Sequence, residues 1–177
     1  MFRYFYIGFL TFLTMNLFPT LGHANPNLKG SKLKYVSSWK KLPSIEGQSL
    51  QTGKIIKVSP EKGTAKVIIF LASWCLKCQK FIPEIKKIEQ EYKDKHTDFL
   101  YVFTHDTESD AKGFIKGYKI DTEAILGSKK ILNDFHQPPL PSIYISDRYE
   151  WLGHREISLN EEGLENINKY LKAHTRI

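Results

Sequence analysis

The stretch KVIIFLASWCLKC occupies residues 66–78 and holds both cysteines of the 177-residue chain. Its apolar first half predicts a buried strand at 66–72. Apolar side chains with a helical period follow within 75–92, so the two cysteines stand one turn apart at a strand-to-helix junction. Such a pair can close and open as a disulfide, and a helix N-terminus favours the thiolate of Cys75. The stretch therefore predicts thiol–disulfide chemistry.

The composition is that of a globular protein with a real core, since 41% of the residues are apolar and 13% are aromatic. The formal net charge is +7, but the basic residues are scattered and often alternate with acidic ones. That pattern is typical of a solvated surface and disfavours nucleic-acid binding. An acidic partner or an anionic membrane surface would suit the charge better, although no basic cluster localises such a contact.

The N-terminus has the pattern of a targeting segment. Arg3 precedes an apolar run at 5–18, Pro19 ends any helix, and small residues lead up to Ala24. The run is too short to span a bilayer comfortably. We expect residues 1–24 to be a signal peptide cleaved after Ala24, with an uncleaved membrane anchor as the alternative. Export to an oxidising compartment, the bacterial periplasm, fits a redox dithiol.

The remaining chain predicts an N-terminal tail at 25–41 and one α/β domain at 42–177. The domain's order of strands and helices predicts a mixed sheet with a parallel part and an antiparallel hairpin edge. Its expected elements are a hairpin within 43–50, strands at 54–58, 66–72, 98–103, 142–146 and 151–157, and helices at 75–92, 109–118 and 128–135. Ser109 or Asp110 would cap the helix at 109–118, and a capping box from Ser158 to Glu161 would open a final amphipathic helix.

Pro141 stands directly before the strand at 142–146, where a proline removes a ladder donor. A cis Leu140–Pro141 bond would explain its presence, because cis bonds are tolerated almost only before proline. The alternative is a proline-rich loop with all bonds trans.

Taken together, the Trp-Cys-x-x-Cys motif at 74–78 and the Pro-Ser pair at 141–142 resemble the thioredoxin fold, and more narrowly the TlpA/ResA-type group of exported thioredoxin-like proteins. The segments 72–75, 82–85 and 141–147 match the group's active-site helix and cis-proline strand. This resemblance implies a mixed central sheet flanked by helices, with an N-terminal hairpin extension and a central helical insert.

The chain departs from the group's pattern at the active site. Ile69 stands where thioredoxins carry a buried aspartate, and Phe81 where ResA-type proteins carry a glutamate. Leu76 and Lys77 replace a dipeptide in which proline is common. The sequence therefore does not support a mechanism that depends on a buried carboxylate beside the dithiol.

The resemblance implies that Cys75 is the attacking thiolate and Cys78 the resolving thiol. Trp74, Leu140 and Pro141 would form an apolar groove for a partner segment, with a core position as the alternative for Trp74. Two further predictions concern charged groups. Lys77 would modulate the dithiol or simply face solvent, and His105 and Asp106 would either handle protons near the sulfurs or belong to a surface loop.

The leading hypothesis is a reductase of specific partner cysteines, and the resemblance implies apocytochrome c or copper-site proteins as clients. We expect protein thiols and disulfides as substrates, a recycling redox partner that could reside in the membrane, a monomer, and no cofactor or resident metal. The alternatives are a dithiol oxidase, a Cu(I) chaperone using both cysteines with His136 or His105, and a structural disulfide without turnover. The direction of electron flow and the client stay open.

Overall fold

The computed structural model describes residues 41–59 and 63–175. The expected signal peptide at 1–24 and nearly all of the expected tail at 25–41 lie outside these residues. The elements in chain order are β1 (Ile45–Gln48), β2 (Ile55–Val58), β3 (Ala65–Leu71), α1 (Leu76–Tyr92), β4 (Thr97–Phe103), α2 (Glu108–Tyr118), β5 (Ala124–Leu126), α3 (Lys129–Asp134), β6 (Ser142–Ser146), β7 (Leu152–Glu156) and α4 (Glu161–His174).

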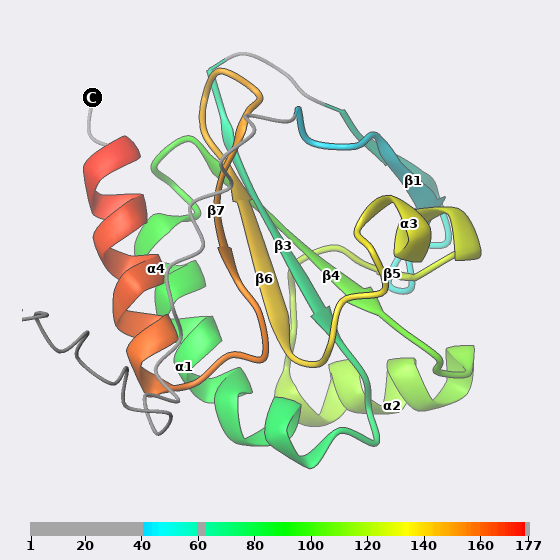
Figure 1. Ribbon diagram of the computed structural model, residues 1–177. Coiled ribbons are helices and arrows are strands. Elements are labelled where there is room, and N and C mark those ends of the chain that lie inside the picture. The colour runs from blue at the N-terminus through cyan, green and yellow to red at the C-terminus, as the bar shows by residue number, and fades with distance from the viewer. Residues whose placement is uncertain (1–40, 60–62, 176–177) are drawn as a thin grey trace, which may run out of the picture.

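The five-stranded sheet has the order β5-β4-β3-β6-β7, with β3 at its centre (Figure 1). β3 pairs parallel with β4 and antiparallel with β6, and β6 pairs antiparallel with β7. The mixed sheet with a parallel part and an antiparallel hairpin edge is therefore confirmed. Every residue of β3 is buried, because helices or the N-terminal hairpin cover both faces of the sheet.

Side-chain alternation along β3 feeds two separate cores. Val67, Ile69 and Leu71 belong to the cluster packed under α1, α2 and α4. Ile68 and Phe70 belong to the cluster under α3 and the β1–β2 hairpin. Right-handed parallel crossovers through α1 and α2 place both helices on one face, and the chain returns across the other face through α3 (Figure 1).

Strand β5 was missed by the sequence interpretation, which expected only helices between β4 and β6. Its three residues are too few to show a period, yet it pairs parallel with β4. The N-terminal hairpin also supports it, because the Leu50 amide donates to the Ala124 carbonyl at 2.8 Å. A Cβ at Gly47 would lie 3.0 Å from the Ile125 side chain, so the hairpin approaches β5 closely at this glycine. The expected insert thus contains a strand as well as helices.

Two helix caps differ from the sequence expectation. α2 begins after Thr107, whose side chain accepts from the Asp110 amide, and neither Ser109 nor Asp110 is the cap. α4 begins after Asn160, which accepts from the Gly163 amide, so the expected capping box from Ser158 does not form. In both cases the residue directly before the first helical residue supplies the capping side chain. Ser158 is left with φ +57° and another role.

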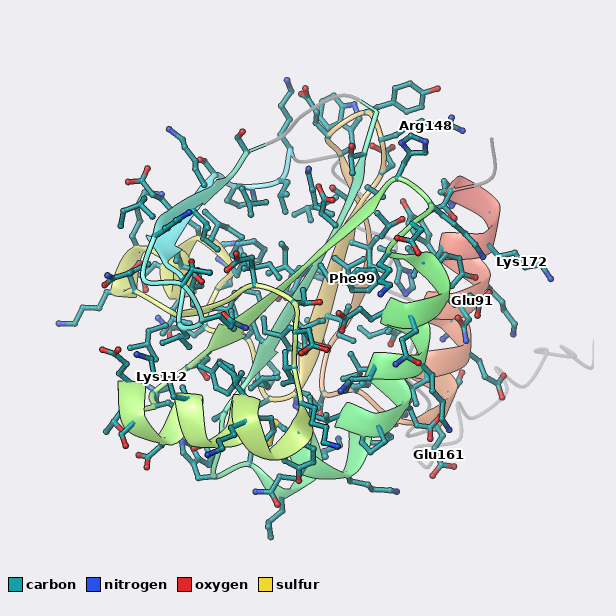
Figure 2. All side chains as sticks on the ribbon, turned by 180° about the vertical axis from the view of Figure 1, so that it is seen from behind. Glu91, Phe99, Lys112, Arg148, Glu161 and Lys172 are labelled. Carbon is teal, nitrogen blue, oxygen red and sulfur yellow. A yellow bond between two sulfur atoms is a disulfide. The ribbon has the colours of Figure 1, made fainter. Side chains whose placement is uncertain are left out.

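The helices carry charged side chains on their outer surfaces, as Lys112, Glu161 and Lys172 illustrate (Figure 2). Several of these charges pair along one helix, for example Lys112 with Glu108 at 2.6 Å. Within the described ranges, no helix is both long and apolar enough to cross a membrane.

Candidate active site

The cysteine pair lies at the edge of the sheet where the parallel strands β3 and β4 end. Ends of parallel strands share one rim, which is where open α/β sheets place their sites. Antiparallel pairing brings the start of β6 to the same rim, because Ser142 is the partner of Phe70. The loop after β7 reaches it too, since Glu156 pairs with Ile143. Four chain segments therefore converge on the cysteines.

Cys75 is the N-cap of α1, and its sulfur accepts from the Cys78 amide at 3.1 Å. The two cysteines form a disulfide in this structure, with their Cα atoms 5.2 Å apart. Cys75 retains 8% of its surface exposed, whereas Cys78 is fully buried at 0%. A free helix N-terminus stabilises negative charge, so this position favours a thiolate at Cys75 when the disulfide opens.

Asp106 fixes the turn that presents Cys75. Its carboxylate accepts from the Ser73 amide at 2.9 Å and from the Ser73 hydroxyl at 2.5 Å. The Gln79 side chain donates to the Ser73 carbonyl at 2.8 Å from the first turns of α1. Asp106 thus supports the turn through Ser73, which stands two positions before Cys75. His105 is exposed, with φ +57°.

Trp74 is 60% exposed, so the alternative of a plain core position is wrong. Its indole N–H donates to the His105 carbonyl at 3.4 Å, which leans the ring toward the loop after β4. Leu76, on the other side of Cys75, is 79% exposed. Large apolar side chains that stay in water beside a reactive group are typical of a binding surface.

The Leu140–Pro141 peptide bond is cis, so this prediction is confirmed and the all-trans alternative is wrong. Continuing the β3–β6 register by one pair would set Pro141 opposite Leu71, just before the cysteine turn. The Pro141 carbonyl accepts from the Leu159 amide at 2.8 Å. Leu140 is partly buried and packs against both cores. The predicted groove residues therefore come from segments that meet at one rim.

Lys77 is exposed, and its ammonium donates to Ser158, at 3.0 Å to the hydroxyl and 3.1 Å to the carbonyl. The sequence interpretation missed Ser158 because it assigned this residue to a helix cap. Asn160, a strong N-cap residue two positions later, was the signal that Ser158 was free for another contact.

The two positions that depart from the family pattern are filled by core side chains. Ile69 is fully buried and Phe81 is 5% exposed, both in the cluster that holds the cysteines. The buried carboxylate of α1 is Glu89, about 16 Å along the helix from Cys78 at 1.5 Å per residue. Glu89 accepts hydrogen bonds from Tyr101 and Thr122, and burial raises its pKa above the usual value.

The residues that a Cu(I) site would need are not gathered here. His136 lies in the loop after α3, on the exposed surface. Across residues 41–59 and 63–175, no group of three or more His, Cys, Asp or Glu side chains is arranged to hold a metal ion.

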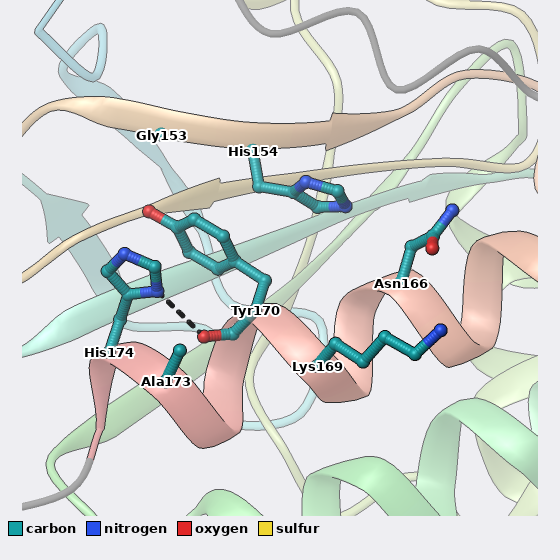
Figure 3. Close-up of a pocket in the computed structure, with 7 residues that line it drawn as sticks. All are labelled: Gly153, His154, Asn166, Lys169, Tyr170, Ala173 and His174. Carbon is teal, nitrogen blue, oxygen red and sulfur yellow. Dashed lines mark hydrogen bonds between the residues drawn. The ribbon is translucent and has the colours of Figure 1, made fainter.

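A separate pocket of about 210 Å³ lies between β7 and the C-terminal half of α4 (Figure 3). Its lining includes Tyr170, stacked between the rings of His154 and His174. A Cβ at Gly153 would collide with the Tyr170 hydroxyl, so a larger residue there would displace this side chain. The pocket holds no cysteine and none of the predicted site residues, which separates it from the disulfide.

Comparison with known proteins gives both sequence and fold relatives. Residues 37–147 match the family model described as Redoxin. The thiol-disulfide oxidoreductase ResA of Bacillus cereus is 27% identical over 124 residues, 70% of each chain. The thioredoxin-like protein YneN of Bacillus subtilis is 28% identical over 127 residues, 67% of this chain and 75% of its own.

Among solved structures, a thiol:disulfide interchange protein of the thioredoxin family from Chlorobium tepidum superposes with a TM-score of 0.69. The sequence identity is 16%, and the match covers 79% of this chain and 99% of that one. At this identity the likeness shows the fold alone.

Proposed function

This chain belongs to the Redoxin family and is a TlpA/ResA-type protein of the thioredoxin superfamily, and from that premise we propose that it is an exported reductase of disulfides in specific partner proteins. The chain is a thiol–disulfide oxidoreductase, and the Cys75–Cys78 pair is the dithiol available for this activity. The direction of electron flow, the clients and the compartment belong to the proposal.

The observation that carries the proposal is the unequal burial of the two sulfurs. Cys75 reaches solvent beside exposed Trp74 and Leu76, while Cys78 is sealed in the core behind it. A partner disulfide can therefore approach only Cys75. A structural disulfide would need no such asymmetry and no apolar rim around it.

The reaction follows from this arrangement. In the reduced protein the Cys75 thiolate attacks one sulfur of the partner disulfide, which forms a mixed disulfide and releases the other partner sulfur as a thiolate. Cys78 loses its proton and attacks Cys75, which closes the Cys75–Cys78 bond and releases the second partner sulfur. Two electrons pass to the partner, and the protein ends in the oxidised form that the structure describes. A recycling dithiol must then reduce it again.

The surroundings of the dithiol support the reductase direction. A stabilised thiolate stabilises the reduced protein and makes the disulfide a stronger oxidant. Here the ammonium of Lys77 is engaged by Ser158, and Ile69 and Phe81 add hydrocarbon to the cluster that holds the cysteines. Hydrocarbon disfavours a charged sulfur, so the reduced form gains little stabilisation beyond the helix N-terminus.

The clients we propose are protein disulfides of the cytochrome c maturation or copper-site type, which the family resemblance suggests. The N-terminal segment at 1–24 would deliver the protein to the periplasm, either by cleavage after Ala24 or as an anchor. Cell fractionation with N-terminal sequencing of the recovered protein tests this part, and recovery from the cytoplasm with Met1 intact would contradict it.

The equilibrium constant with glutathione tests the direction. We expect a reduction potential below about −230 mV, since that range makes a protein a reductant toward most partners. A value near −120 mV, typical of a strong oxidant, would overturn the reductase proposal in favour of the oxidase.

A trapping experiment tests the clients. In a Cys78→Ser variant the mixed disulfide cannot resolve, so covalent complexes should accumulate in cells and can be identified by mass spectrometry. The matched control is Cys75→Ser. Its one remaining thiol, Cys78, is buried, so this variant should trap nothing. Equal trapping by both variants would contradict the assignment of Cys75 as the attacking thiol.

A further inference from the structure

Lys77 lies between the two cysteines and links two parts of the site. Its side chain leaves the first turn of α1 and ends at the loop between β7 and α4. Two hydrogen bonds hold it there, to the hydroxyl of Ser158 at 3.0 Å and to the Ser158 carbonyl at 3.1 Å. An ammonium has three donors, so most of its hydrogen-bonding capacity is directed at one residue.

Ser158 and its neighbour in turn hold the residues at the start of β6. The Ser158 amide donates to the Ser142 hydroxyl at 3.3 Å, and the Leu159 amide donates to the Pro141 carbonyl at 2.8 Å. The Ser142 hydroxyl also donates to the Pro139 carbonyl. A continuous set of hydrogen bonds therefore runs from the residue between the cysteines to the backbone on both sides of Pro141.

The backbone at Ser158 is suited to this link. Its φ of +57° is uncommon for a residue with a side chain and turns the chain sharply after β7. The turn presents the Ser158 carbonyl and hydroxyl together toward α1. A second connection from α1 lies farther on, where Lys80 is 3.4 Å from Glu161 of α4, but both of these side chains are exposed and neither forms a hydrogen bond with the Pro141 loop among the described residues.

We propose that Lys77 is a positioning residue that fixes the cysteine turn of α1 against the Pro141 loop through Ser158. This inference rests on the proposed function for its catalytic consequence. The two walls of the groove at Cys75 come from different segments, and the Lys77–Ser158 bonds set their separation. Lys77 thus acts on the binding of a protein segment and not as a charge on the sulfur.

The first experiment compares a protein disulfide with a small one. Lys77→Met keeps the apolar stem and removes the donors. Its kcat/KM for insulin reduction should fall about three- to tenfold, the range for partly exposed bonds to a charged donor. The rate with hydroxyethyl disulfide, which needs no groove, should stay within twofold, as should the equilibrium constant with glutathione.

Four further variants sharpen this comparison. Lys77→Arg keeps a charged donor and should restore most of the insulin activity. Ser158→Gly removes the hydroxyl at a backbone angle that glycine accepts, and the double variant Lys77→Met/Ser158→Gly should be no worse than the poorer single variant, because both disrupt the same link. Lys80→Met, which removes an equal charge from the same helix, should retain full activity.

The proposal is overturned if Lys77→Met slows both disulfides equally, or shifts the glutathione equilibrium tenfold, since either result identifies a direct charge effect on Cys75. Amide hydrogen exchange decides the matter independently of activity. Exchange at Leu159 should be faster in Lys77→Met and unchanged in Lys80→Met. If the wild-type protein reduces neither disulfide, the proposed function fails, and the exchange data alone decide the role of Lys77.

Discussion

The two ends of helix α1 handle a titratable group in opposite ways. At its N-terminus, Cys75 is 8% exposed, and Asp106 holds the preceding turn through Ser73. Near its C-terminus, Glu89 is equally little exposed, at 8%, but both of its carboxylate oxygens accept hydrogen bonds, from Tyr101 and Thr122. Hydrogen-bond partners, and not exposure to solvent, therefore separate the reactive group from the structural one along this helix.

Positions 69 and 81 carry no carboxylate, so the buried acid to consider on this helix is Glu89. The helix does carry a buried acid, but about 16 Å away at 1.5 Å per residue, where it cannot exchange protons directly with the sulfurs. Proton transfer at the dithiol therefore does not pass directly through Glu89. We expect the two ends to respond independently to mutation.

The largest expected effect is at the reactive end. Cys75→Ser should reduce turnover of disulfides by a factor of about a thousand or more, because the attacking group is lost. The insulin-reduction assay measures the loss. The pH dependence of unfolding that comes from Glu89 should be the same in Cys75→Ser as in wild type. A variant that still turned over at an appreciable rate would mean that Cys78 can be reached from solvent, contrary to its burial.

A smaller effect is expected at the rim. Trp74→Ala should lower kcat/KM for a protein disulfide about tenfold, in the range of an interface tryptophan, and change stability by less than about 0.5 kcal/mol. Its matched control is Tyr149→Ala, since Tyr149 is 62% exposed at the β6–β7 turn, away from the site. Equal losses of activity in both variants would show that exposure alone, and not position beside Cys75, is responsible.

Removing the support of the cysteine turn should mainly lower the stability of the protein. Asp106→Ala removes the acceptor of two hydrogen bonds from Ser73 and should destabilise the protein by about 1–2 kcal/mol. Denaturant titration measures this, with exposed Asp94→Ala as the control. Unchanged stability together with a lost pH dependence of activity would instead assign Asp106 a direct proton-handling role.

The smallest effect concerns the buried end. Burial raises the pKa of Glu89 above its unfolded value, so the folded protein binds a proton that the unfolded chain releases. Stability from this group is present below the unfolded pKa of about 4.5 and is lost as pH rises through the folded value. Glu89→Gln should therefore unfold at a higher temperature than wild type at pH 8, and the gap should close toward pH 4.

The control for this measurement is Glu84→Gln, an exposed acid of the same helix. The glutathione equilibrium of Glu89→Gln should stay within twofold of wild type. A larger shift would break the comparison, because it would show that the two ends of α1 are coupled.

Much of the fold could be predicted from residue patterns because both cores depend on simple alternation and period. The strand at 142–146 has the predicted bounds, and β3 and α1 differ from prediction by a residue at their ends. The short strand β5 could not be found, since three residues between polar and glycine-containing turns carry no period. Its position depends on contacts with β4 and the N-terminal hairpin, which are distant in sequence.

The site divides in the same way. Cys75, Cys78 and Pro141 could be predicted because their spacing and neighbours carry a chemical meaning. The contacts of Asp106 and Ser158 could not be predicted, because each residue binds a partner far along the chain. Asp106 binds Ser73, and Ser158 binds Lys77. A local pattern, such as the apparent capping box at Ser158, then suggested a role that the better cap Asn160 takes instead.

The complete shielding of Cys78 offers a way to read the oxidation state of this protein in a mixture. Iodoacetamide added to the folded protein should alkylate one sulfur of each reduced molecule and neither sulfur of an oxidised one, and the same reagent added in denaturant should alkylate both sulfurs of the reduced form. The fraction of molecules that gain the mass of one adduct under folding conditions would give the share that is folded and reduced, without an antibody or an activity assay.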